Sequence, residues 1–153
     1  MHLAELNISE LLAPLESPQL RDFVANVDRM NSLAERSDGF VWRFKDDARN
    51  PVPTVSPWPN NVIYTLSVWQ SPEQLEHFVW NTVHKKIYQR KQEWFQHMKS
   101  HHLVMWWVDE GSWPTLAEAK ARLDHLDANG NSDHAFDWSH LPHAKLWQTQ
   151  RCA

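Results

Sequence analysis

The stretch VIYTLSVWQSPEQL, residues 62–75, decides the fold, because it contains a strand, a short turn and the start of a helix. Residues 62–69 are rich in β-branched and aromatic side chains, which is typical of a β-strand. Ser71 is a suitable N-cap, Pro72 suits the first helical position, and Glu73 places an acid in the first turn. The stretch therefore predicts a strand that leads at once into a helix.

That helix is predicted to be long. Apolar residues recur at intervals of three or four positions, which places them on one face of an α-helix. The series comprises Leu75, Phe78, Val79, Val83 and Ile87, and continues with Trp94, Phe95 and Met98.

Upstream, the pattern predicts two more strands around a helix. Residues 2–8 alternate between apolar and polar side chains, and residues 17–33 have helical periodicity after a Ser-Pro start. Residues 40–44 alternate again, so the three aromatic side chains would share one face and Arg43 would lie on the other. Residues 46–61 contain four prolines and form a long connection.

Downstream, residues 103–108 are almost continuously apolar, as expected of a strand covered on both faces. A further helix is predicted from about Thr115 to Leu126, with Gly130 after its end. The order is βαββαβ, which predicts an α+β protein with a ferredoxin-like, four-stranded antiparallel sheet, a C-terminal helix and a tail. We expect one domain over residues 1–136 and a tail over residues 137–153.

Composition narrows the classes of function. The formal net charge is −4 and the pI is about 6.2, which argues against nucleic-acid binding. Cys152 is the only cysteine, so a reducing, cytoplasmic location is expected. No apolar run approaches a membrane span, and the three glycines form neither a P-loop nor a dinucleotide fingerprint. We therefore expect no membrane partner and no nucleotide cofactor.

Several ordered motifs make the chain resemble the DUF3291 family, whose function is unknown. They are GFVWR (39–43), SVWQS (67–71), FVW (78–80) with His84, and WWV (106–108) followed by Gly111, Pro114 and Thr115. The resemblance implies membership of the dimeric α/β-barrel superfamily, which includes antibiotic-biosynthesis monooxygenases and haem-degrading enzymes. A homodimer is also expected because a sheet with helices on one face leaves its other face, with Trp42 or Trp106, exposed.

His84 is the main candidate catalytic residue. On a continuous helix it would lie on one ridge with Trp80 and Tyr88, and it could act as a base or as an axial ligand to haem. The alternative is a histidine that is hydrogen-bonded between helix and sheet. Counting from Trp69, the ligand histidine of the haem-degrading relatives would fall near Tyr88 instead.

Asn7 and Arg43 are the other candidate catalytic residues, since both lie on strand faces opposite apolar neighbours. Arg43 could hold a carboxylate or a phenolate, and Asn7 could orient an oxygen. The alternative for both is a structural polar pair.

Ten tryptophans in 153 residues serve as core, interface or cavity walls. Trp69, Trp80 and Trp94, together with Tyr88, are the candidate substrate-binding residues because they are expected near His84. Trp106 and Trp107 are adjacent on a strand and must point to opposite faces. His97 and His101 are four residues apart, but no cysteine or acidic cluster accompanies them, so no metal site is expected.

Three functions are compatible with this sequence. The first is binding of an aromatic or apolar small molecule, in its most concrete form by a cofactor-independent monooxygenase with His84 as base. The second is haem binding through His84. The third is a non-catalytic dimeric module, in which all the aromatic side chains are core and interface.

Overall fold

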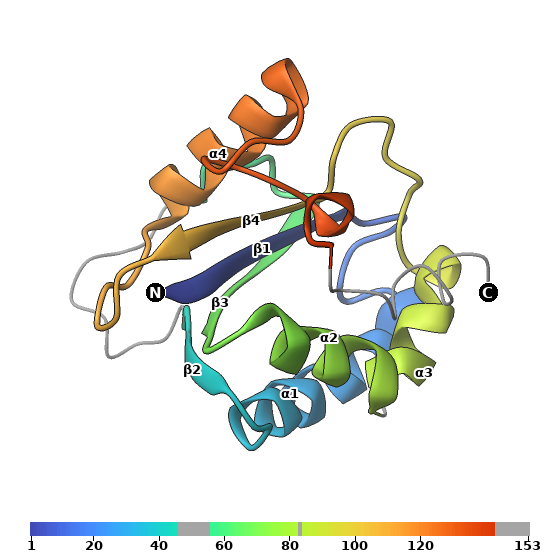
Figure 1. Cartoon of the computed structure of the whole chain (residues 1–153). Coiled ribbons are helices and arrows are strands. Elements are labelled where there is room, and N and C mark those ends of the chain that lie inside the picture. Colours follow the sequence, from blue (N-terminus) through green and yellow to red (C-terminus); the bar gives the residue numbers. More distant parts are fainter. Residues whose placement is uncertain (46–55, 83, 143–153) are drawn as a thin grey trace.

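The computed structural model describes residues 1–45, 56–82 and 84–142. Within them, four strands form one antiparallel sheet in the order β2-β3-β1-β4 (Figure 1). This mixed α+β architecture and its antiparallel sheet confirm the coarse prediction. The strands are β1 (His2–Glu10), β2 (Phe40–Arg43), β3 (Val62–Trp69) and β4 (Leu103–Val108).

The helices lie on both sides of this sheet. Figure 1 shows α1 and α2 below the sheet and α4 above it. The α-helices are α1 (Arg21–Glu35), α2 (Pro72–Asn81), α3 (His84–Gln89) and α4 (Leu116–Asn129). Short 3₁₀ turns are η1 (Pro18–Leu20), η2 (Lys91–Glu93) and η3 (Trp138–His140).

The predicted long helix after residue 71 is wrong, because it breaks at Thr82. This residue has extended backbone angles (φ −123°, ψ −178°), and its hydroxyl donates a hydrogen bond to the carbonyl of Phe78 at 2.6 Å. A side chain that satisfies a terminal carbonyl competes with continuation of the helix. α3 therefore starts afresh at His84, and Val83 lies outside the described residues.

The predicted alternation in β2 is also wrong, because a register shift lies between Phe40 and Trp42. A bulge of this kind changes which face the following side chains occupy. Phe40 packs edge to face on Trp69, whereas Trp42 stacks on Trp113 with ring centroids 5.5 Å apart. The aromatic side chains of this strand are thus divided between the two faces of the sheet.

One face of the sheet packs against α4. Trp106, Leu6 and Val68 on this face are 0% exposed, and they form one core cluster with Leu123 and Leu126 of α4. The argument for a homodimer from an uncovered apolar face is therefore incorrect, since a helix of the same chain covers it. The C-terminal helix was expected, but its position on this face was not.

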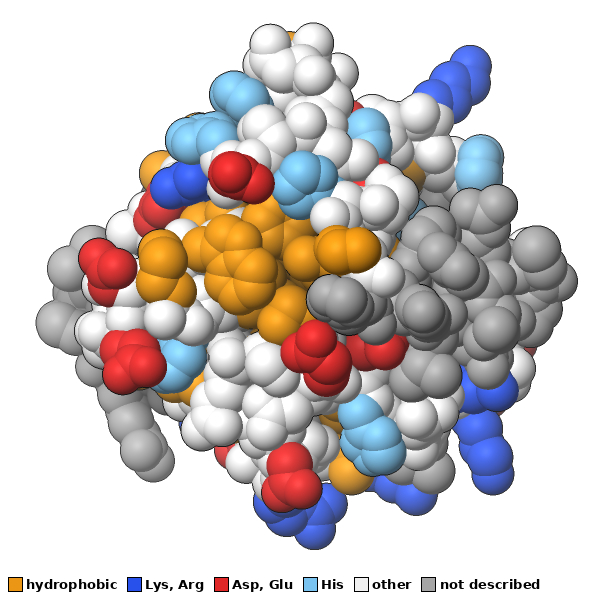
Figure 2. Space-filling view, viewed as in Figure 1, with side chains coloured by type: hydrophobic (Ala, Val, Ile, Leu, Met, Phe, Trp, Pro, Cys, Tyr) orange, Lys and Arg blue, Asp and Glu red, His pale blue; other side chains and the backbone are white. Residues whose placement is uncertain are grey.

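The other face carries a second cluster around Trp69 and Phe78, and Trp138 of η3 belongs to it. The chain after residue 136 therefore contributes to the core up to the last described residues. Phe136 also covers the edge strand β4, because its backbone exchanges two hydrogen bonds with Met105, at 2.7 and 2.9 Å. Figure 2 shows hydrophobic side chains reaching the surface between α4 and α2.

α1 differs from the other long helices because none of its residues is fully buried. Its predicted apolar stripe is present, but Phe23, Val27 and Met30 are only partly covered. An amphipathic helix normally gains its stability by burying such a stripe against the core. In this protein the stripe faces a hollow.

Candidate functional site

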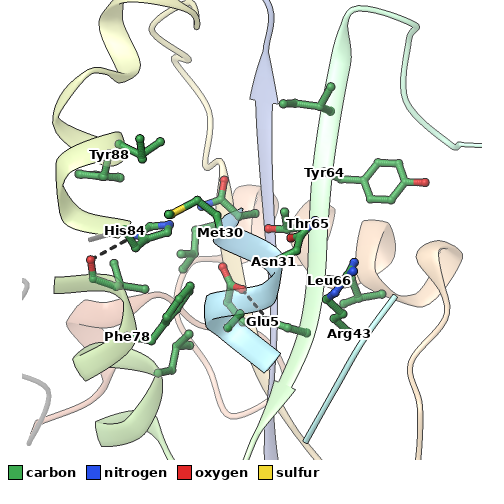
Figure 3. A pocket seen from close by; sticks show the side chains of 18 of the residues that line it. Glu5, Met30, Asn31, Arg43, Tyr64, Thr65, Leu66, Phe78, His84 and Tyr88 are labelled. Atoms are coloured by element: carbon green, nitrogen blue, oxygen red, sulfur yellow. Dashed lines mark hydrogen bonds between the residues drawn. The ribbon is translucent and has the colours of Figure 1, made fainter. Parts of the chain in front are cut away.

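The hollow is a cavity of about 950 Å³ between the sheet and the helices α1, α2 and α3. Figure 3 shows its two sides: Glu5 and Thr65 come from strands, whereas Met30, Phe78 and His84 come from helices. A volume of this size is in the range of cavities that bind small organic molecules.

The sheet side of the cavity is polar. Glu5 and Asn7 of β1 point to the same face, because residues two apart on a strand do so. Their cross-strand partners on β3 are also polar, since Glu5 pairs with Ser67 and Asn7 pairs with Thr65. A short row of hydrogen-bonding groups therefore crosses an otherwise apolar sheet.

The helix side is mainly apolar. α1 contributes one side chain per turn, and α2 and α3 add aromatic and aliphatic groups. The lining residues from these helices include Phe23, Val27, Met30, Ala34, Leu75, Phe78, Val79 and Ile87. A ligand would therefore contact hydrogen-bonding groups on one side and apolar surface on the other.

Glu5 is the most unusual residue of the site, and the sequence did not identify it. Its side chain is buried (8% exposed), and its Oε2 accepts a hydrogen bond from the Ser67 hydroxyl at 3.2 Å. The indole Nε1 of Trp69 donates to the same hydroxyl oxygen at 3.0 Å. Because an indole N–H can only donate, the Ser67 hydroxyl hydrogen is directed toward Glu5. Burial raises the pKa of Glu5 to about 7, and the Ser67 hydrogen bond only partly opposes this.

His84 lies in the cavity wall as predicted, but at the first residue of α3. Its Nδ1 is 3.2 Å from the carbonyl oxygen of Val79, and a carbonyl can only accept, so Nδ1 is the protonated nitrogen. Burial lowers the pKa of His84, although the bond to Val79 opposes the shift. The ring centroids of Phe78 and Tyr88 lie 4.9 and 6.5 Å from it. His84 is therefore a neutral imidazole with its acceptor at Nε2.

Arg43 and Asn7 both line the cavity, but only Asn7 has the expected place on its floor. The Nε of Arg43 donates to Glu35 of α1 at 2.6 Å, and the Lys45 ammonium is 3.4 Å from the same carboxylate oxygen. The Arg43 hydrogen bond lowers the pKa of Glu35. Arg43 thus forms the structural ion pair that was its alternative interpretation.

Three of the four predicted substrate-binding residues line the cavity: Trp69, Trp80 and Tyr88. Trp80 and Tyr88 pack edge to face at 5.0 Å. The prediction for Trp94 is wrong, because it is buried in a separate cluster with Leu11 and Leu20. The broken helix explains the difference, since Trp94 follows η2 rather than continuing the stripe of α2.

The sequence was compared with known proteins. The family described as "Domain of unknown function (DUF3291)" matches residues 2–152. The chain belongs to the DUF3291 family. No curated protein matches the sequence.

In this DUF3291 protein, the histidine-rich segments are engaged elsewhere. His101 Nδ1 is 2.8 Å from Asp127, and its Nε2 is 3.6 Å from Asp137. In the part of the chain that the structure describes, no three His, Cys, Asp or Glu side chains are placed to hold a metal ion. The described helices include none with the length and apolarity to cross a bilayer.

Proposed function

We propose that this protein binds a small organic molecule, largely apolar or aromatic, in the cavity between the sheet and α1, α2 and α3. The observation that carries the proposal is the apolar stripe of α1, which faces about 950 Å³ of space instead of a packed core. Protein interiors are normally packed to the density of organic crystals, so a hollow of this size under an amphipathic helix suits a ligand.

We also propose that the fold is ferredoxin-like. The antiparallel strand order β2-β3-β1-β4 and the βαββαβ chain order support this. We do not extend the proposal to a dimeric barrel, because α4 lies on the face through which two such sheets would pack.

The binding proposal predicts that Met30→Trp weakens binding of the neutral, apolar dye Nile red. Met30 lines the cavity, and the larger indole occupies ligand volume, so we expect an affinity loss of about tenfold or more. The measurement is a fluorescence titration of the dye. The matched control is Arg29→Trp, because Arg29 is exposed on the same helix and is not a lining residue. Equal dye affinity in both variants would contradict the proposal.

Cofactor-independent oxygenation is a second candidate function, and the position of Glu5 favours it. A carboxylate with a pKa of about 7 in an aromatic cavity can take a proton from a substrate near neutral pH. An electron-rich phenol would lose its hydroxyl proton to Glu5 and supply the electrons that reduce O₂. One oxygen atom would enter the ring to give a quinone, and the other would leave as water. Glu5 thus takes the role that the sequence suggested for His84.

This second candidate predicts oxygen consumption with substituted phenols, measured with an oxygen electrode. Glu5→Gln is expected to lower kcat at least about 100-fold, because an amide cannot accept the proton. Glu35→Gln serves as the control, since Glu35 pairs with Arg43 and is not a lining residue. Unchanged oxygen uptake in Glu5→Gln would exclude Glu5 as the base.

Haem does not fit the residues of this cavity. His84 could offer Nε2 as an axial ligand, because its Nδ1 is held by Val79. However, haem carries two propionate groups, and the charged lining is three carboxylates against one guanidinium that already pairs with Glu35. Like charges in a partly buried site are unfavourable. We therefore propose no haem-dependent chemistry.

A further inference from the structure

The charges that line the cavity are predominantly negative. Its carboxylates are Glu5, Asp28 and Asp137, and Arg43 is its one guanidinium among the described residues. No lysine is among these lining residues. The imidazoles of His84, His101 and His102 complete the ionisable nitrogen groups, and the hydroxyls of Tyr64 and Tyr88 are the remaining titratable groups.

Neither of the nearest basic side chains balances Glu5. Arg43 is bound to Glu35 at the rim, at 2.6 Å. His101 is placed between Asp127 and Asp137, at 2.8 and 3.6 Å. Glu5 is bonded to the neutral hydroxyl of Ser67, and the hydrogen bonds among the described residues include none to its second oxygen, Oε1. Buried carboxylates are normally paired with a cation, so Glu5 lacks a partner that a ligand could supply.

The surroundings of Glu5 also suit a cation attached to an aromatic group. Trp69, which is hydrogen-bonded to Ser67, stacks with Phe78 at a centroid distance of 5.3 Å. Phe40 packs edge to face on the same indole at 5.6 Å. Aromatic rings attract organic cations through their quadrupole and also pack well against a flat ligand.

We propose that the ligand is an aromatic amine, bound as its ammonium ion with the positive charge on Glu5 and the ring among the aromatic side chains. This inference rests on the proposal that the cavity binds a small molecule, and it is independent of the oxygenation proposal. Asn7 and Thr65 lie next to Glu5 on the same strand face, and they provide further hydrogen-bonding groups for the polar end of the ligand.

The experiment compares 2-phenylethylamine with 2-phenylethanol by isothermal titration calorimetry. These probes have the same ring and chain length, but only the amine is charged at pH 8. A charge-assisted hydrogen bond in a desolvated site corresponds to about 10- to 100-fold in affinity, so we expect the amine to bind tighter by that factor. In Glu5→Gln the two probes should bind equally, whereas Glu35→Gln should retain the preference.

The pH gives a second readout. Because only the ionised carboxylate attracts the ammonium ion, amine affinity should rise about tenfold from pH 6 to pH 8 if the pKa of Glu5 is about 7. Affinity for the alcohol should change little, and Glu5→Gln should remove the rise for the amine. This variant separates Glu5 from the histidines, which also titrate in this range.

Each other outcome overturns a defined part of the inference. Equal binding of amine and alcohol by the unmodified protein would refute a cationic ligand while leaving the cavity proposal intact. An amine preference that survives in Glu5→Gln would move the charge recognition to Asp28 or Asp137. If neither probe binds to protein that still binds Nile red, only the amine inference fails.

Discussion

Glu5→Gln should raise the free energy of unfolding of the ligand-free protein at pH 8 by about 3 kcal/mol, a value that follows from a pKa displaced from 4.5 to about 7. Between these two pH values the folded protein keeps a proton on Glu5 that the unfolded chain releases. The carboxyl group is therefore neutral for stability below pH 4.5. It becomes increasingly destabilising as the pH rises through 7.

Urea denaturation of both proteins between pH 4.5 and pH 8.5 measures this effect. The difference between them should be small at the acidic end and should grow with pH. Glu35→Gln is the control with the opposite sign, because Arg43 lowers the pKa of Glu35, so its ionised form stabilises the fold. Parallel pH profiles for Glu5→Gln and the unmodified protein would show that Glu5 is not buried as described.

The second large effect is expected from Trp106→Ala. Trp106 is 0% exposed and lies in the core cluster between the sheet and α4, so its removal should cost about 3–5 kcal/mol of stability. The guanidinium of Arg122 on α4, 5.7 Å from the ring centroid, also loses its contact. Thermal unfolding followed by circular dichroism measures the loss.

Trp113→Ala provides the matched control. Trp113 is 50% exposed and stacks only at the surface on Trp42, so its loss should cost about 1 kcal/mol or less. Because α4 and not a second subunit covers Trp106, the Tm of the unmodified protein should be independent of protein concentration. A Tm that rises with concentration would instead show that a partner subunit contributes to this core.

Strong local signals made much of the fold predictable. Residues 62–69 and 103–108 carry dense β-branched and aromatic sequence, and both strands have the bounds that were expected. The Ser71 cap is also present, since its hydroxyl accepts a hydrogen bond from the backbone N–H of Gln74. The break at Thr82 was missed because an apolar stripe continues across it, and the competing side-chain hydrogen bond has no periodic signature.

The candidate site was predicted in part. Asn7, His84, Trp69, Trp80 and Tyr88 were expected near one another, and all of them line the cavity. Glu5 was overlooked because an acid on the polar side of an alternating strand normally indicates a face in water. Its presence two residues before Asn7, on a face that a helix had to cover, was the available signal. The position of α4 could not be deduced, since its apolar stripe fits either face of a sheet.

The incomplete burial of α1 has a consequence for how this protein can change over evolutionary time. Because none of its side chains is fully buried, substitutions along its cavity-facing stripe would alter the shape of the site at little cost to the sheet. Glu5, in contrast, is fixed within a strand that pairs on both sides. Related chains could therefore diverge in the molecules they accept by varying α1 while they retain the same acidic floor.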